Sequence, residues 1–154
     1  MKRIACLFVV CALLFTTSCT KKNNNANSGI WNIGSIQYGA SVVQLQGTEF
    51  TASNGLNAMH AYFATVPTVT ANYKIVDENR AVTGVLAAGE IAISFNVEGT
   101  DTYLSTGTSN DSASVAIEGG IMTIKVSPTP VQHYAGGPAL DVNIASGVIK
   151  TNSY

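Results

Sequence analysis

Strict alternation of apolar and polar residues is the feature that most constrains this chain. Within Gly89–Gly99, every second residue is apolar, namely Ile91, Ile93, Phe95 and Val97. A period of two buries one face of an extended strand and leaves the other face in water. A second alternating segment, Ser114–Val126, is interrupted at Gly119-Gly120, and glycines supply the positive φ angles of a tight turn. We therefore predict a strand in the first segment and a β-hairpin in the second.

The same pattern recurs in shorter pieces after residue 29. The further candidate strands are Trp31–Ile33, Ile36–Leu45, Thr48–Ala52, Ala58–Thr65, Asn72–Val76, Thr102–Ser105, Val131–Tyr134, Leu140–Ile144 and Val148–Lys150. The four prolines all fall between these strands, at Pro67, Pro128, Pro130 and Pro138. Asp77–Ala88 has room for a helical turn, although Gly84 argues against a long helix. Short strands at this spacing predict one all-β domain over residues 30–154, an antiparallel β-sandwich or alternatively a small β-barrel.

The N-terminal segment has the pattern of an export signal. Lys2 and Arg3 precede an apolar run, Ile4–Phe15, of 12 residues. A helix that spans a bilayer needs about 20 apolar residues, whereas the apolar core of a signal peptide needs roughly 7–15. The run is followed by small residues and a cysteine, Thr16-Thr17-Ser18-Cys19. We therefore predict a helical signal peptide over residues 1–18.

This ending resembles the lipobox of bacterial lipoproteins. The resemblance implies that the Cys19 thiol receives a diacylglycerol, that a peptidase cuts before Cys19, and that the new amine is acylated. Three acyl chains would hold the protein on a bilayer, since one chain alone binds only marginally. Residues 19–29 are polar and rich in asparagine, which is typical of a flexible tether. Thr20 stands where an aspartate would signal retention in the inner membrane, so the resemblance points to the outer membrane of the cell envelope.

Charge and cysteine placement exclude several classes of protein. All three cysteines lie in the first 19 residues, so the domain has no disulfide framework and no cysteine-based metal site. From residue 30 onward the chain carries four basic and nine acidic residues. A domain with a net charge of −5 is a poor candidate for binding nucleic acid. The expected partners are the bilayer and an unidentified envelope protein or glycan.

The sequence offers little that points to catalysis. The two histidines are His60, mid-strand beside Tyr62, and His133, in a loop-like stretch between prolines. We interpret both as structural, because no spacing typical of a zinc site or of a serine nucleophile accompanies them. We expect no catalytic residue, no metal and no cofactor. The remaining candidate for a ligand surface is an aromatic patch, if the four tyrosines share a face: Tyr62, Tyr73, Tyr103 and Tyr134.

Three functions follow as hypotheses. The order of several residues resembles that in small all-β lipoprotein domains of Bacteroidetes-type bacteria, whose function is uncharacterised. These residues are Trp31, Gly34, Tyr38, Asn54-Gly55 and Asp101-Thr102-Tyr103. The first hypothesis is therefore a non-catalytic envelope lipoprotein that acts in binding, adhesion or as an accessory module. The second is a lipocalin-like barrel, which requires an interior cavity of at least ~300 Å³. The third is a small hydrolase, which requires a histidine near a carboxylate and a nucleophile in a cleft.

Overall fold

Eleven strands and one helical turn account for most of the chain in the computed structural model, which describes residues 27–107 and 110–152. The strands are β1 (Ser28–Ile33), β2 (Ile36–Ala40), β3 (Val42–Gln46), β4 (Glu49–Ser53), β5 (Ala58–Phe63), β6 (Ala71–Val76), β7 (Glu90–Val97), β8 (Asp101–Ser105), β9 (Ser112–Glu118), β10 (Ile121–Tyr134) and β11 (Val142–Asn152). The turn is α1 (Asn79–Val82). The predicted all-β class and the single short helical turn are thus confirmed.

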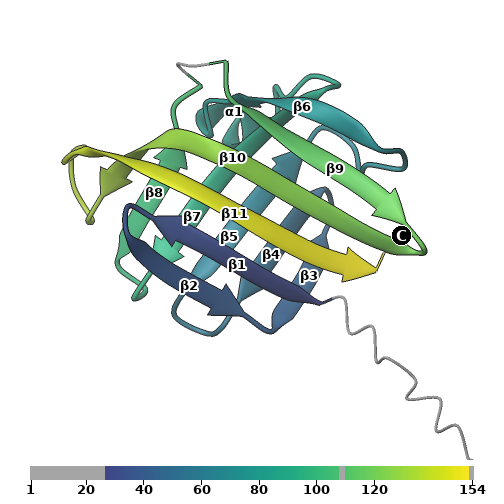
Figure 1. Cartoon of the computed structure of the whole chain (residues 1–154). Coiled ribbons are helices and arrows are strands. Elements are labelled where there is room, and N and C mark those ends of the chain that lie inside the picture. The colour runs from purple at the N-terminus through teal and green to yellow at the C-terminus, as the bar shows by residue number, and fades with distance from the viewer. Residues whose placement is uncertain (1–26, 108–109, 153–154) are drawn as a thin grey trace, which may run out of the picture.

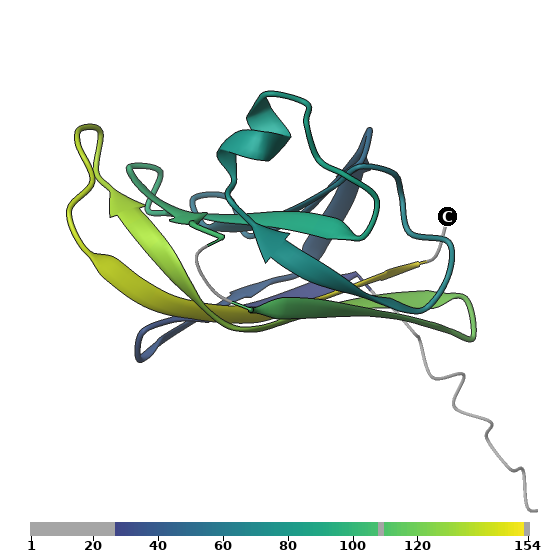
Figure 2. The same cartoon turned by 90° about the horizontal axis from the view of Figure 1, so that it is seen from above.

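The strands form one continuous sheet that folds over into two layers (Figures 1 and 2). The order along the sheet is β2-β1-β11-β10-β9-β6-β7-β5-β4-β3. The layer of β1, β2, β9, β10 and β11 is the front layer in Figure 1, and β3, β4, β5 and β7 lie behind it. Two strands join the layers, because β6 pairs with both β9 and β7, and β8 pairs with both β10 and β7.

Large apolar side chains fill the space between the two layers. The largest that are fully buried are Trp31, Phe50, Phe63, Phe95 and Met59. They come from the inward phase of the alternating strands, as in β5, where Met59, Ala61 and Phe63 are all buried. Phe50 and Phe63 meet edge to face, with ring centroids 5.8 Å apart, which is a favoured aromatic geometry. The core is thus continuous across both layers.

The two strongest sequence signals are confirmed. The alternating segment Gly89–Gly99 contains β7, which pairs with β5, β6 and β8; its apolar residues are buried as predicted, and Ala92 and Ser94 on the other face are buried too. The predicted hairpin is formed by β9 and β10, in which Glu118 pairs with Ile121 across the two-residue turn. Gly119 and Gly120 both have positive φ, 57° and 77°, so a residue with a side chain would be strained at either place.

The proline prediction is wrong at two positions. Pro128 and Pro130 do not separate strands but lie inside β10, which runs unbroken for 14 residues. The register of β10 against β11 shifts between Val126 and Thr129, which is the signature of a β-bulge. A bulge leaves a residue unpaired, and so it accommodates a proline that has no N–H for the ladder. The predicted strand Val131–Tyr134 is therefore the end of β10.

Other strand limits differ from the prediction for reasons of topology. The predicted strand Ile36–Leu45 breaks at Ser41 into β2 and β3, because the chain crosses there from one layer to the other. Leu140–Ile144 and Val148–Lys150 instead merge in β11, which pairs along most of its length with β10. The strands pair in the expected antiparallel way, except that β6 and β7 are parallel. The helical turn α1 lies in the connection between these two strands.

Candidate functional site

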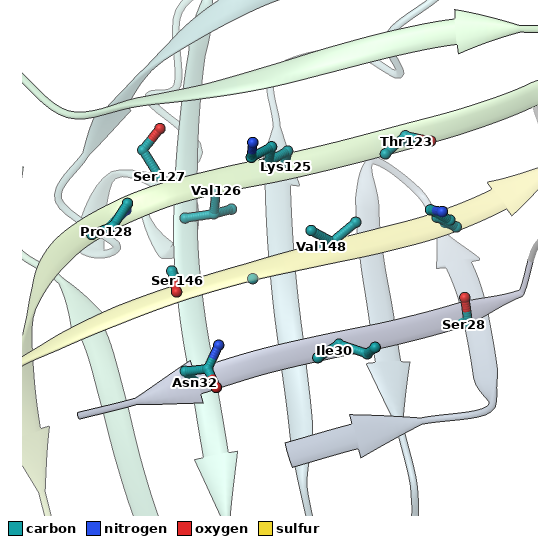
Figure 3. A pocket seen from close by; sticks show the side chains of 12 residues that line it. Ser28, Ile30, Asn32, Thr123, Lys125, Val126, Ser127, Pro128, Ser146 and Val148 are labelled. Carbon is teal, nitrogen blue, oxygen red and sulfur yellow. The ribbon is translucent and has the colours of Figure 1, made fainter. Parts of the chain in front are cut away.

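A groove of about 720 Å³ lies on the outward face of β1, β11 and β10 (Figure 3). Its walls are formed by outward-facing residues of these three strands and by the residues at the bulge of β10. The lining residues are Ser28, Ile30, Asn32, Thr123, Lys125, Val126, Ser127, Pro128, Ser146, Gly147, Val148 and Lys150. Because the groove lies on the outside of the front layer, it is separate from the packed core.

Strand register places the groove residues side by side. On β11, Val148 pairs with Ile30 of β1 on one side and with Lys125 of β10 on the other. Two residues further on, Lys150 pairs with Ser28 and with Thr123. Side chains directly opposite one another on a sheet face lie within contact range. One row of the groove thus holds Val148 between Ile30 and Lys125, and the next row holds Lys150 between two hydroxyl groups.

Two lysines give the groove its charge. Lys125 and Lys150 are exposed, and in the described part of the chain no ion pair involves either of them. The other two basic residues of the domain lie elsewhere: Arg80 bonds Glu90 at 2.7 Å, and Lys74 pairs in register with Glu90. The groove is therefore a cationic and partly apolar surface, suited to a ligand that combines negative charge with apolar groups.

His60 belongs to a polar cluster on the outward face of the opposite layer. Its Nδ1 lies 2.6 Å from Glu49 Oε1, and Thr51 donates a hydrogen bond to the same carboxylate oxygen at 2.8 Å. Asn96 Nδ2 donates to His60 Nε2 at 3.2 Å, so Nδ1 carries the proton that faces Glu49. The ring also stacks on Tyr62, as the alternation of β5 predicts.

This arrangement differs from that of a hydrolytic triad. In such a triad a hydroxyl or thiol bonds the histidine nitrogen that is not bound to the carboxylate. For His60 that nitrogen, Nε2, is bonded to the Asn96 amide. Ser94, the register partner of His60 on β7, is instead 3.3 Å from the Tyr62 hydroxyl through its Oγ. Burial raises the Tyr62 pKa, and the Ser94 contact lowers it in part.

His133 lies in the predicted strand Val131–Tyr134, which is the end of β10, although its position between prolines is loop-like in the sequence. It lies in β10 opposite Tyr103 of β8, and their rings stack with centroids 4.4 Å apart. Its Nδ1 is 2.8 Å from Asp141 Oδ1, and its Nε2 is 3.7 Å from Asp101 Oδ2 without a hydrogen bond. Burial, followed by the charges of Asp101 and Asp141, raises the Tyr103 pKa. His133 therefore ties the hairpin between β10 and β11 to β8.

The four tyrosines do not gather on one face. Tyr62 stacks on His60 on the outward side, whereas Tyr73 packs edge to face on the core residue Phe63, at 5.0 Å. Tyr103 stacks on His133 and packs against the core. Tyr134 ends β10 opposite Thr102. The structure thus does not assemble the aromatic patch considered from the sequence.

Comparisons with protein-family models, with curated proteins and with solved structures found no match. A functional assignment for this chain therefore depends on its own residues and geometry. Within residues 27–107 and 110–152, no group of three or more His, Cys, Asp or Glu side chains is placed to hold a metal ion. Over the same ranges, no helix has the length and apolar character to cross a membrane. The predicted lipidation residue, Cys19, lies outside the described residues.

The groove was missed at the sequence level. Lys125 is recognisable from the sequence as an outward residue of an alternating strand, but Lys150 and Ile30 lie more than 20 positions away from it in either direction. Their proximity depends on β11 pairing with both β1 and β10, and the sequence holds no signal for that order. The one available hint was that Lys125 and Lys150 both fall in predicted strands of a chain with only 11% charged residues.

Proposed function

We propose that this protein is a lipid-anchored, non-catalytic binding module of a bacterial envelope, and that the groove on β1, β11 and β10 is its binding surface. The observation that carries the proposal is the groove itself: the aliphatic side chains of Ile30 and Val148 lie beside two lysines that form no ion pair with any described residue. Anchoring through acylated Cys19 is supported by the lipobox-like ending Thr17-Ser18-Cys19 after an apolar run. Thr20 after the cysteine favours the outer membrane.

The interior supports a binding module over a lipocalin-like barrel. A carrier of that kind holds its ligand between the layers, where this protein has Trp31, Phe50 and Phe95 at 0% exposure. The groove of about 720 Å³ lies on the outer face instead. The two histidine environments likewise favour a non-catalytic module, since His60 Nε2 is bonded to an amide and His133 Nε2 faces a carboxylate.

Metabolic labelling with palmitate tests the anchor. The wild-type protein should take up the label and stay with the membrane fraction after a high-salt wash. The Cys19→Ala variant should lose both properties. Cys11→Ala is the matched control, because Cys11 lies in the segment that cleavage removes, and it should label like wild type. Label that persists in the Cys19→Ala variant would place the acyl chains elsewhere and refute the proposal.

A further inference from the structure

An exposed apolar stripe runs along the outward face of β11 and β1. Val142 is 61% exposed and Ile144 52%; beyond Ser146 on the same strand, half-buried Val148 pairs with Ile30, which is 53% exposed. The stripe continues to the exposed ring of Pro128 on β10. Single exposed aliphatic residues are ordinary, but several on one sheet face beside a groove mark a surface that meets another molecule.

Charge is distributed unequally between the two layers. Residues 42–105, which form β3 to β8 and α1, carry six carboxylates and two basic side chains. Residues 28–41 and 110–152, which form the strands of the front layer and their loops, carry three carboxylates, Asp111, Glu118 and Asp141, and the two groove lysines, so this layer is the less acidic one. An acidic module near an anionic surface will therefore turn its front layer, with Lys125 and Lys150, toward that surface.

The path of the chain brings the same face to the bilayer. Ser28 both begins β1 and lines the groove, and it follows Cys19 by nine residues. Nine residues reach at most about 30 Å when fully extended. The acyl anchor thus holds the groove within a short distance of the headgroups, at a high effective concentration.

We propose that the outward face of β1, β11 and β10 docks on the anionic surface of the bilayer in which acylated Cys19 is anchored. Lys125 and Lys150 contact phosphate groups, and Ile30, Val148 and Ile144 enter the headgroup region. This inference rests on the proposed lipid anchor and names the ligand of the same groove as lipid headgroups. Each lysine at an anionic surface strengthens attraction by about fivefold. The acidic layer, with Glu49 and His60, then faces away from the membrane.

A bilayer fits this face better than a second copy of the chain does. A symmetric pair formed through this face would bring the two lysines of one copy toward those of the other, and like charges at close range oppose association. Anionic headgroups complement them. The expected contact is therefore weaker at high salt, because salt screens exposed charges.

A fluorophore on the groove tests the docking in the full lipidated protein. After cleavage before Cys19, whose sulfur is acylated, an introduced cysteine is the only free thiol, since Cys6 and Cys11 are removed. Ser146→Cys places an environment-sensitive dye in the groove. Ser53→Cys is the matched control on β4, in the opposite layer. In vesicles of phosphatidylcholine with phosphatidylglycerol, the dye at 146 should shift to the blue and lose access to iodide, while the dye at 53 should do neither.

Charge variants and vesicle composition complete the test. The double variant Lys125→Glu/Lys150→Glu should abolish the blue shift at 146 while the protein stays anchored, and Lys74→Glu, on β6, should leave it unchanged. Vesicles of phosphatidylcholine alone should also abolish it. An anchored protein whose dye at 146 stays in water would overturn the docking and leave the anchor intact. Failure to co-float with vesicles would instead refute the anchor. A blue shift that depends on protein concentration without vesicles would show a second copy on this face and overturn the proposal.

Discussion

Gly147 on β11 lies directly opposite Trp31 on β1, so close that an added Cβ at position 147 would stand 2.9 Å from the Trp31 Cβ. The same atom would be 2.6 Å from Met59 Sδ. Contacts below 3.0 Å force neighbouring atoms to move. The absence of a side chain at 147 is therefore what allows Trp31 and Met59 to pack beneath the sheet that carries the groove.

Gly147→Ala is expected to destabilise the protein by about 1–3 kcal/mol, the usual cost of overpacking a core. Trp31, the single tryptophan, reports unfolding by its fluorescence in urea. Gly39→Ala is the matched control, because Gly39 is also in a strand and its added Cβ would meet nothing closer than 3.9 Å. Equal midpoints for the two variants would contradict this account of the core.

Ser105 joins three segments through one hydroxyl. Its Oγ accepts a hydrogen bond from the Ile93 N–H at 3.1 Å and donates one to the Val76 carbonyl at 2.6 Å. Ser105→Ala leaves both buried backbone groups without this partner, at a cost of about 1–3 kcal/mol. Ser112→Ala, at an exposed position of β9, should change the free energy of unfolding much less. Urea midpoints measure both, and a neutral Ser105→Ala would show that the hydroxyl is dispensable.

Glu78 makes stability depend on pH. Burial raises the pKa of its carboxyl above the ordinary value, and the charges of Asp77 and Glu49 raise it further, while His60 opposes them. The folded protein therefore binds the proton more tightly than the unfolded chain. It follows that Glu78 lowers the stability as pH rises from about 4.5 through its folded pKa. Glu78→Gln should thus stabilise the protein at pH 7 and have little effect below pH 4.

Urea denaturation of the Glu78→Gln variant across this range of pH shows whether the substitution raises or lowers the free energy of unfolding. Glu118→Gln, at the exposed end of β9, serves as the control for loss of one negative charge. If Glu78→Gln destabilised the protein at pH 7, the carboxylate would have to be held by a favourable contact, and the argument from burial would be wrong.

Asp141 fixes the loop that joins β10 to β11. Its carboxylate bonds His133 Nδ1 at 2.8 Å and accepts a hydrogen bond from Asn143 Nδ2 at 3.0 Å. Asp141→Ala should speed hydrogen exchange at residues 135–140 while global stability falls by less than about 1 kcal/mol, as for other exposed pairs. Amides beside Gly119-Gly120 provide an internal reference in the same sample. Unchanged exchange in the loop would mean that its backbone hydrogen bonds to His133 are enough to hold it without the Asp141 carboxylate.

Alternation and turn residues made much of the fold predictable. The segment around Phe95 and the glycine pair at 119 and 120 each specify a local structure without help from distant residues. The prediction that Pro128 and Pro130 separate strands was wrong, because their place inside β10 depends on a register shift against β11. The parallel pairing of β6 with β7 depends likewise on the path of the whole sheet.

The candidate site was less predictable than the fold for the same reason. The sequence places His60 beside Tyr62 on one face, but its contact with Glu49 requires the pairing of β4 with β5. Lys125 and Lys150 approach one groove only because β11 lies between β1 and β10. The alternation of apolar and polar residues shows which residues of one strand share a face. Contacts between residues of different strands can be inferred only when the order and register of the strands are known.

Mass spectrometry of the protein purified from native membranes identifies its N-terminal residue and any acyl groups on that residue. We expect the most N-terminal peptide to begin at Cys19 and to carry a diacylglycerol on sulfur with a further acyl group on the amine. A mature protein that begins at Met1, or that begins at Cys19 with a free thiol, would contradict it.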